Sequence, residues 1–228
     1  RSEHAFEKAR QLTNGEMSIS DWASAHEYYG LHKTSDGWVF REWAPNATSL
    51  WLVGDFNGWK ADITFEARRI PGTDDWEWKG NSSLISHGQN YRLEIRWDGG
   101  CGERLPAYAR YVVQDSQTAL FCARVNEPDK PYVWKNPVPP KPSIPLIYEA
   151  HVGMAGEECK VSTYVEFAEN ILPRIKENGY NTVQLMAVME HPYYGSFGYH
   201  VSSFFAASSR FGTPEALHYL IDDAHRLG

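Results

Sequence analysis

Apolar residues recur at two different spacings along this chain, and the change of spacing marks its first boundary. In residues 1–28 they stand at loose helical intervals among charged residues, and Asn14-Gly15 interrupts the pattern. We therefore predict a short helical segment over residues 1–28, with Ser20 or Asp21 as a cap. The apolar positions of this segment are Phe6, Leu12, Ile19 and Trp22.

Residues 29–126 contain short apolar runs separated by turn residues. The clearest run, 91–97, alternates apolar residues with Arg92, Glu94 and Arg96, which is the pattern of a strand with one buried and one solvated face. Glycine-containing turns lie beside or between these runs. We predict a small antiparallel β-sandwich with strands at 38–43, 49–53, 76–79, 91–97 and 110–114 and turns at 36–37, 57–58 and 98–100.

Prolines recur between Glu127 and Pro145. Proline suits neither the middle of a strand nor the interior of a helix, so residues 127–145 are predicted to be a linker. A new apolar run at 146–152 predicts a strand. Thr163 and Glu166 then form a capping box for a helix that runs toward Gly179 and is kinked or restarted at Pro173.

A second strand and helix follow this first pair. Residues 181–188 are apolar on both faces, which predicts a buried parallel strand. Thr213 and Pro214 fit the N-cap and first position of a helix, whose apolar stripe is Leu217, Leu220, Ile221, Ala224 and Leu227. Two strand and helix pairs in succession imply a parallel sheet.

The loop at 189–212, between the second strand and its helix, is rich in aromatic residues and glycine. A loop in this position, at the carboxyl end of a parallel strand, is where α/β folds place ligand sites. A complete (β/α)₈ barrel needs roughly 250 residues, so residues 146–228 can supply only part of one. We expect either a small open sheet or the front portion of a larger enzyme, and the second is favoured because the chain ends on a helix.

Composition narrows the choice of partner. A hydrophobic content of 42% is enough for a packed core. The formal net charge is −7, which leaves no broad cationic surface, so nucleic acid and membranes are not expected as partners. Three scattered cysteines fit a reducing compartment, and no signal or membrane-spanning segment is expected. We predict a cytoplasmic protein. Because the chain begins at Arg1, removal of a targeting peptide stays open. No metal or cofactor is proposed, since phosphate-loop, dinucleotide and paired-cysteine motifs are absent from the sequence.

Several segments together resemble the eukaryotic-type 1,4-α-glucan branching enzymes of the α-amylase superfamily. They are Gly54-Asp-Phe-Asn-Gly-Trp59, Tyr148-Glu-Ala-His-Val-Gly-Met154, Leu172-Pro-Arg-Ile-Lys176, Gly179-Tyr-Asn181 and Met189-Glu-His-Pro-Tyr-Tyr-Gly-Ser-Phe-Gly-Tyr199. The resemblance extends from at least Tyr29 over the rest of the chain. It implies a multidomain fold: a helical segment (1–28), a starch-binding-type β-sandwich (29–126), a linker (127–145), and the first two β/α units of a truncated TIM (β/α)₈ barrel (146–228).

The resemblance also implies an activity. Such enzymes cleave an α-1,4 bond with retention and transfer the glucan segment to a 6-hydroxyl, and retention needs two carboxyl groups about 5 Å apart. In the family these groups follow the fourth and fifth barrel strands. We therefore expect the catalytic aspartate and glutamate to lie beyond residue 228, and residues 1–228 to bind α-1,4-glucan (glycogen, amylose or maltooligosaccharides) without branching it. A plastid location is expected if the source is a plant or alga.

Candidate substrate-binding residues follow from matching positions in the family. Tyr199 matches a tyrosine whose ring lies under the sugar at the cleavage subsite, where an aromatic face suits pyranose C–H groups. Glu190 and His191 stand at a strand end, where they could bond sugar hydroxyls or support the loop. Glu149 beside His151 resembles an acid/base pair, but a carboxylate within a strand favours a structural role. In the sandwich the matching or neighbouring positions are Trp43, Ala44, Pro45, Trp59, Trp76 and Arg92.

Two alternatives stay open. A non-catalytic glucan-binding protein would need only the sandwich, and the aromatic loop at 189–212 argues against it. A debranching or amylolytic hydrolase of the same superfamily would share most of these motifs. Transfer and hydrolysis are distinguished by residues that this sequence does not contain.

Overall fold

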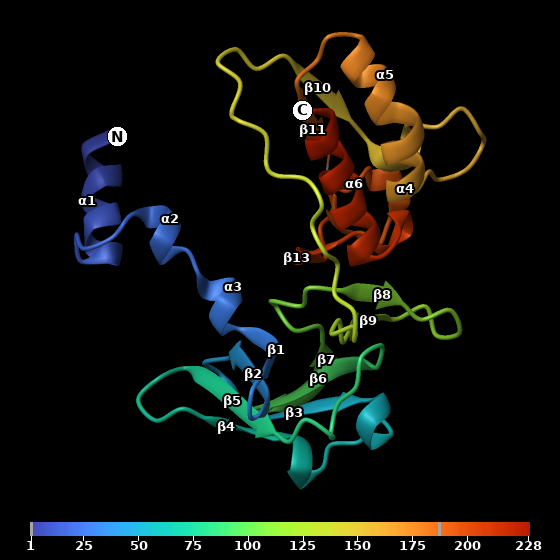
Figure 1. The fold of residues 1–228 in the computed structure, drawn as a ribbon. Helices are drawn as coiled ribbons and strands as arrows, with labels where there is room; N and C mark the ends of the chain where they lie inside the picture. The colour runs from blue at the N-terminus through green and yellow to red at the C-terminus, as the bar shows by residue number, and fades with distance from the viewer. Residues whose placement is uncertain (1, 187) are drawn as a thin grey trace.

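The computed structural model describes residues 2–186 and 188–228. Ala187, within the predicted strand at 181–188, lies outside the described residues. The chain passes from helices at its N-terminus through a β-rich middle part to an α/β part at its C-terminus (Figure 1). Among the described residues, no helix is both long enough and apolar enough to cross a membrane.

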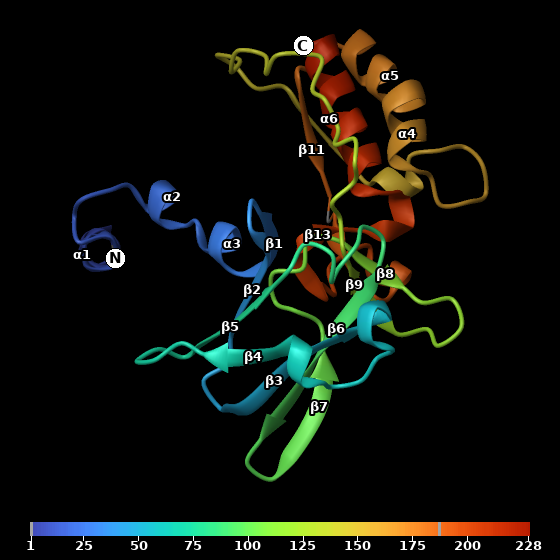
Figure 2. The same ribbon diagram turned by 60° about the horizontal axis from the view of Figure 1, so that its bottom comes forward.

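The N-terminal segment forms three helices: α1 (Ser2–Thr13), α2 (Ile19–Trp22) and α3 (Ala25–Tyr28). Asn14 and Gly15 adopt positive φ angles and end α1, as the sequence predicted. The predicted cap at Ser20 or Asp21 is wrong. Ser18 caps α2 instead, because its hydroxyl accepts a hydrogen bond from the Asp21 N–H at 3.1 Å. In Figures 1 and 2, α1 stands apart from the rest of the chain.

The middle part is built from nine antiparallel strands. Their order is β1-β2-β5-β4-β3-β6-β9-β8, and β7 also pairs with β6, along Leu93–Trp97. All five predicted strands are present, and β1, β4, β7 and β9 are additional. The strands are β1 (Gly30–Thr34), β2 (Gly37–Trp43), β3 (Ala47–Gly54), β4 (Glu66–Arg69), β5 (Asp75–Gly80), β6 (Asn90–Trp97), β7 (Gly100–Arg104), β8 (Val112–Gln114) and β9 (Phe121–Arg124).

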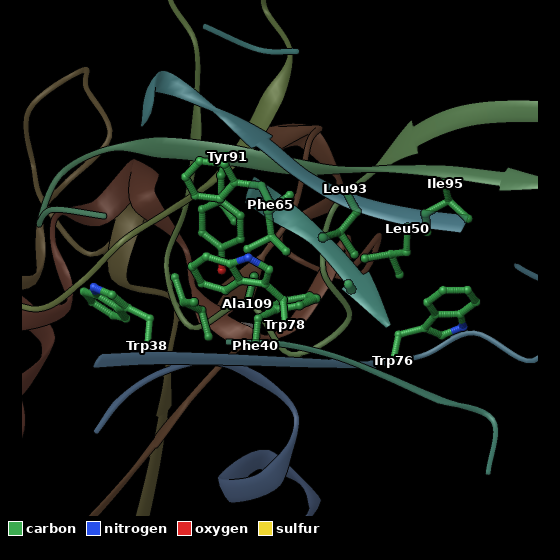
Figure 3. Close-up of a cluster of buried hydrophobic side chains, with 14 of the residues drawn as sticks. Trp38, Phe40, Leu50, Phe65, Trp76, Trp78, Tyr91, Leu93, Ile95 and Ala109 are labelled. Atoms are coloured by element: carbon green, nitrogen blue, oxygen red, sulfur yellow. The ribbon is translucent and has the colours of Figure 1, made fainter. Parts of the chain in front are cut away.

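Large apolar side chains fill the space between two layers of these strands. Those of β2 and β5 face those of β3 and β6, as Figure 3 shows. The alternation in the sequence explains the arrangement, since every second residue of each strand points inward. The inward residues include Trp38, Phe40, Trp76, Trp78, Leu50, Leu52, Tyr91, Leu93 and Ile95.

The turn predicted at residues 57–58 is present, but it does not form the tip of a tight hairpin, although Asn-Gly favours one. Residues Asp55–Asn57 form a short 3₁₀ helix, η1, and β3 pairs next with β6 and β4 rather than closing a hairpin there. The Asn57 side chain accepts a hydrogen bond from the Gly54 N–H at 2.9 Å and donates one to the Leu52 carbonyl at 3.0 Å. These bonds replace the strand pairing that a hairpin would provide.

Residues 125–146 contain no helix or strand and cross to the α/β part. One buried carboxylate anchors this linker. Asp222 of α6 (Pro214–Leu227) accepts hydrogen bonds from the Tyr132 hydroxyl at 2.8 Å and from the N–H groups of Lys135 and Asn136 at 3.1 and 2.9 Å. Trp134 lies between His218 and His225, with ring centroids 5.3 and 6.0 Å away.

The α/β part has the predicted parallel strand pair. β10 (Ile147–Ala150) pairs in parallel with β11 (Thr182–Leu185). The Thr163–Glu166 capping box starts α4 (Tyr164–Glu166), and a π-helical segment (Phe167–Ile171) leads into α5 (Leu172–Glu177), where Pro173 occupies the first turn. Thr213 caps α6 through the Ala216 N–H. The helix signals were therefore read correctly.

Residues 181–188 were predicted to form a buried strand. A strand is present at Thr182–Leu185, but it is only partly buried. The helices lie on one side of the β10–β11 pair and form a core with it (Figure 2). On the other side Ile147 is half exposed and Glu149 is exposed. The described residues supply no layer over that face, so only one side of the pair is covered.

The loop that follows β11 contains a small antiparallel pair that the sequence did not reveal, β12 (Met189–Glu190) with β13 (Ser203–Ala207). This pair carries Phe205 to the sandwich, where its ring stacks on Tyr108 at 4.4 Å, and Tyr108 in turn stacks on Tyr29 at 5.1 Å. Ala206 packs into the sandwich core. The aromatic loop therefore joins the two parts of the chain.

Candidate functional site

The end of β2 places a buried carboxylate next to an exposed ring. The strand alternates inward and outward residues while it pairs with β5. Glu42 is an inward residue and only 2% exposed, whereas Trp43 follows on the outer side and is 56% exposed. The strand ends there, because the chain turns at Ala44 toward β3. No neighbouring strand covers the Trp43 ring.

Both residues line a pocket of about 510 Å³ at this end of the sandwich. Its lining combines aromatic faces with charged groups, which is the chemistry of a site for polar, ring-shaped ligands. The other lining residues are Tyr29, Arg104, Leu105, Ala107 and Tyr108. We call this the Trp43 pocket.

Glu42 is the electrostatic centre of the Trp43 pocket. Burial raises its pKa to about 7, against the opposing effects of a hydrogen bond from the Ala107 N–H at 3.0 Å and of the Arg104 guanidinium at 3.7 Å. The folded protein therefore exchanges a proton at this carboxyl near neutral pH. A titrating carboxyl in a cleft is a candidate functional group.

Ala44, Pro45 and Trp76, three of the predicted binding residues, lie together beside the Trp43 pocket. The Ala44 carbonyl accepts a hydrogen bond from the Trp76 indole at 3.0 Å, and the Pro45 carbonyl accepts one from Arg69 at 2.9 Å. Ala44 is buried and Pro45 is half-buried, so this turn is firmly held. Its rigidity fixes the exposed Trp43 ring.

The prediction that Trp76 contacts sugar is wrong, because the structure buries its ring. Trp76 is 6% exposed and belongs to the sandwich core. Its position is inward in the alternation of β5, opposite Glu42 of β2. A covered ring cannot stack on a ligand, so Trp76 supports Trp43 through Ala44 instead.

Trp59 is exposed and held rigidly, at the opposite end of β3 from Trp43. Its backbone is in the left-handed region, with φ of 62°. The indole N–H donates to Asp55 at 3.1 Å, and the exposed fraction of the residue is 38%. Arg92 lies on the neighbouring strand β6 beside Glu103, 3.6 Å from its carboxylate, and is mostly covered. Because Trp59 and Trp43 lie at opposite ends of β3, they belong to two separate surfaces rather than to one site.

Tyr199 is 71% exposed in the loop after β12. Its N–H donates to the Ser196 carbonyl at 3.0 Å, within the turn that follows Tyr194. Phe197, two residues before Tyr199, has a φ of 54°, so a bulky residue is held in the left-handed region. The ring of Tyr199 is free to meet a ligand.

Glu190 and His191 are fully buried, which supports loop scaffolding rather than direct sugar contact. The Glu190 carboxylate accepts hydrogen bonds from the N–H groups of His191 and Ser209 at 3.1 and 2.7 Å. The His191 ring bonds the Met189 carbonyl at 3.0 Å. These contacts tie the two ends of the loop together.

Glu149 and His151 do not form a pair. Glu149 is exposed and accepts a hydrogen bond from Gln184 at 3.3 Å. His151 lies buried among aromatic rings, with both ring nitrogens unpartnered. Burial, followed by the nearby His191, lowers the pKa of His151. The placement of Glu149 agrees with the expectation that it has a structural role and not an acid/base role.

Sequence reasoning found only Trp43 among the residues that line the pocket, and the charged and aromatic ones that it missed are Tyr29, Glu42, Arg104 and Tyr108. The alternation of β2 does contain a signal for Glu42, because it falls on the inward side with Trp38 and Phe40. A carboxylate at a core-facing position is unusual unless it is paired or functional. Arg104 could not be found, since β7 itself was not predicted. Within the described residues, no cluster of histidine, cysteine and acidic side chains could hold a metal ion.

Comparisons with known proteins place this geometry in context. Residues 28–109 match the family described as carbohydrate-binding module 48 (isoamylase N-terminal domain). Two solved pullulanases share the fold. One, from Bacillus subtilis complexed with maltose, gives a TM-score of 0.68 at 22% identity and covers 90% of this chain and 33% of its own. The other, from Paenibacillus barengoltzii, gives 0.70 at 18% identity and covers 96% and 40%.

The fold and these matches define a β-sandwich of the carbohydrate-binding module 48 type joined to an α/β segment, an arrangement shared with the two pullulanases. Sequence similarity then identifies the relatives more narrowly. The chain is 45% identical to the 1,4-alpha-glucan-branching enzymes of Oryza sativa and Yarrowia lipolytica over 93% of its length, and 43% identical to that of Dictyostelium discoideum over 96%. The resemblance to the 1,4-alpha-glucan branching enzymes is thereby confirmed. The chain spans only 27% to 33% of the length of these relatives.

Proposed function

We propose that this chain is the glucan-binding part of a 1,4-alpha-glucan branching enzyme. The whole enzyme would cleave α-1,4 glucan with retention and transfer the segment to a 6-hydroxyl. Residues 1–228 would bind the polymer, with the catalytic carboxylates supplied by other residues. Its ligand is neutral α-1,4-glucan, namely glycogen, amylose or maltooligosaccharides.

The observation that carries this proposal is the Trp43 pocket. A ring that is 56% exposed and a carboxylate that is 2% exposed line one cavity, within the residues that match a carbohydrate-binding family. A sugar ring has an apolar C–H face and polar edges, and such a pocket offers a partner for each. The net charge of −7 is compatible with an uncharged polymer.

We assign the parts of the chain as follows. Residues 1–28 are a helical extension, 29–126 the module, 127–145 the linker, and 146–228 the start of a (β/α)₈ barrel whose first two strands are β10 and β11. Their parallel pairing and the half-exposed face of β10 support this assignment. Tyr199 then contributes to the groove that binds the glucan segment to be cleaved. Trp43 and Trp59 bind more distant parts of the same glucan. We place the protein in a reducing compartment, the cytoplasm or a plastid.

The test is a titration with maltoheptaose, monitored by tryptophan fluorescence. We expect Trp43→Ala to weaken binding by about 1 to 3 kcal/mol, the range for losing a large aromatic anchor. The matched control is Trp22→Ala, since Trp22 is 45% exposed on α2, away from the pocket. Equal affinities for wild type and Trp43→Ala would overturn the proposal.

A further inference from the structure

The two carboxylate oxygens of Glu42 have different surroundings. Oε2 accepts the hydrogen bond from the Ala107 N–H at 3.0 Å. Oε1 lies 3.7 Å from Nη2 of Arg104, which is too long for a hydrogen bond. Among the described residues no other donor bonds it. In the Trp43 pocket Oε1 therefore has an ion-pair partner in Arg104 but no hydrogen-bond donor from the described part of the chain.

A structural role does not explain this oxygen. Capping the Ala107 N–H requires a single acceptor, which a glutamine would supply without bringing a charge into the sandwich. Burying a carboxylate without its full set of donors is unfavourable. The Glu42 side chain is only 3% exposed, but Oε1 is not one of the atoms sealed from solvent without a partner, so a ligand in the pocket can reach it. The arrangement suits a group that receives a donor from a ligand.

The rest of the Trp43 pocket indicates which donor that is. Trp43 presents an apolar face, and Tyr29 and Tyr108 stack on each other beside it. Because the Tyr29 and Tyr108 rings cover each other, Trp43 offers the open aromatic face. A sugar fits such a face and brings hydroxyl donors to a carboxylate. We propose that Oε1 of Glu42 accepts a hydrogen bond from a hydroxyl group of the α-glucan that stacks on Trp43. This inference rests on the proposed function.

Glu42 is the group in the Trp43 pocket whose pKa lies near neutrality, and several other titratable or charged groups face it. They are Arg104 on β7, Tyr91 on β6, and Tyr29 and Tyr108 in the pocket lining. Burial raises the pKa of Tyr91 and of Tyr29, the latter also through its hydrogen bond to Asp75. Arginine stays protonated in proteins. Glu42 itself has its pKa raised to about 7 by burial.

This setting gives the proposal a measurable consequence. A carboxylate is a stronger acceptor than a carboxylic acid, because hydrogen bonds to ionised groups are roughly twice as strong. Maltoheptaose affinity should therefore increase about fivefold between pH 5.5 and pH 8.5. Binding at pH 7 should also release protons, which calorimetry in buffers of different ionisation enthalpy detects.

Glu42→Gln separates this role from packing. Its amide oxygen would be held by the Ala107 N–H, so its NH₂ group would point into the pocket in place of Oε1. We expect Glu42→Gln to bind maltoheptaose about five- to tenfold more weakly at pH 8.5 and with no pH dependence. Glu77→Gln is the matched control, because Glu77 is paired with Arg41 and Lys79 on the outer side of β5. It should keep the wild-type pH profile.

A second variant tests the electrostatics. Arg104 favours the charged form of Glu42, so Arg104→Gln should move the midpoint of the pH profile to higher pH. If Glu42→Gln keeps the wild-type affinity or pH profile, the inference is overturned while a weakened Trp43→Ala would leave the proposed function intact. If Trp43→Ala binds normally, both fail. Thermal melts of each variant show whether it is folded.

Discussion

Glu42 and Trp43 are consecutive residues in opposite environments, and the period of a β-strand accounts for the difference. Inward and outward positions alternate, so Glu42 enters the end of the core while Trp43 faces solvent. The sequence predicted Trp43 as a contact through family resemblance, but its partner Glu42 was visible only in the strand pattern. Tyr29 and Tyr108 could not be predicted, because their stacking joins residues far apart in sequence.

Stability should fall as pH rises through the titration of Glu42. Its pKa is raised from 4.5 to about 7 in the folded protein, so between these values the folded state binds more protons than the unfolded state. The contribution is therefore lost on going from pH 4.5 to above pH 7. Glu42→Gln should be more stable than wild type at pH 8 by about 1 to 3 kcal/mol, and similar to it at pH 4.5. Urea unfolding at both values measures this, and an equal difference at both would contradict it.

Trp59 makes a separate prediction at the far end of β3. Its ring is fixed by Asp55 and exposed, so Trp59→Ala should weaken maltoheptaose binding by about 1 to 3 kcal/mol. Trp134→Ala is the control, because Trp134 is a comparably exposed tryptophan in the linker. An unchanged affinity would remove Trp59 from the binding surface.

At the scale of elements, the sequence predicted those whose stability comes from an apolar face. Most of the predicted strands alternate, although β8 does not, and the helices at Thr163 and Thr213 carry their caps in the sequence. The strands it missed lack that signal. β4 reads Glu-Ala-Arg-Arg, and β7 is exposed at every position. Backbone pairing with a neighbouring strand forms them, and this depends on contacts distant in sequence.

At the scale of elements, the prediction concerns how Asp222 holds the linker on α6. Burial alone would raise the pKa of Asp222, but hydrogen bonds from Tyr132, Lys135 and Asn136 lower it to about 2. The stabilisation from these bonds is present above pH 3.8 and is lost as pH falls toward 2. Asp222→Asn replaces an acceptor by a donor facing these groups.

Hydrogen exchange measures the effect. In Asp222→Asn the amides of Lys135 and Asn136 should exchange roughly tenfold faster or more than in wild type. Asp223→Asn is the neighbouring control, since Asp223 pairs with Arg226 on the same helix. Unchanged exchange at Lys135 and Asn136 would show that Asp222 does not hold the linker.

At the scale of the molecule, the uncovered side of the β10–β11 pair is the prominent unsatisfied surface. Ile147 is half exposed there, and unpaired strands with apolar faces associate readily. The chain of residues 1–228 should therefore self-associate in solution. Ile147→Thr should reduce this more than Val133→Thr, in which the lost side chain is an exposed valine of the linker. Sedimentation velocity distinguishes the cases, and a monomeric wild type would contradict an open barrel.

The most direct test of the account is a crystal structure of this chain with maltoheptaose. We expect a glucose ring lying flat on Trp43, about 4 Å from its indole, with one of its hydroxyls at hydrogen-bond distance from Oε1 of Glu42. A complex in which the sugar occupies another surface and the Trp43 pocket stays empty would contradict the central claim.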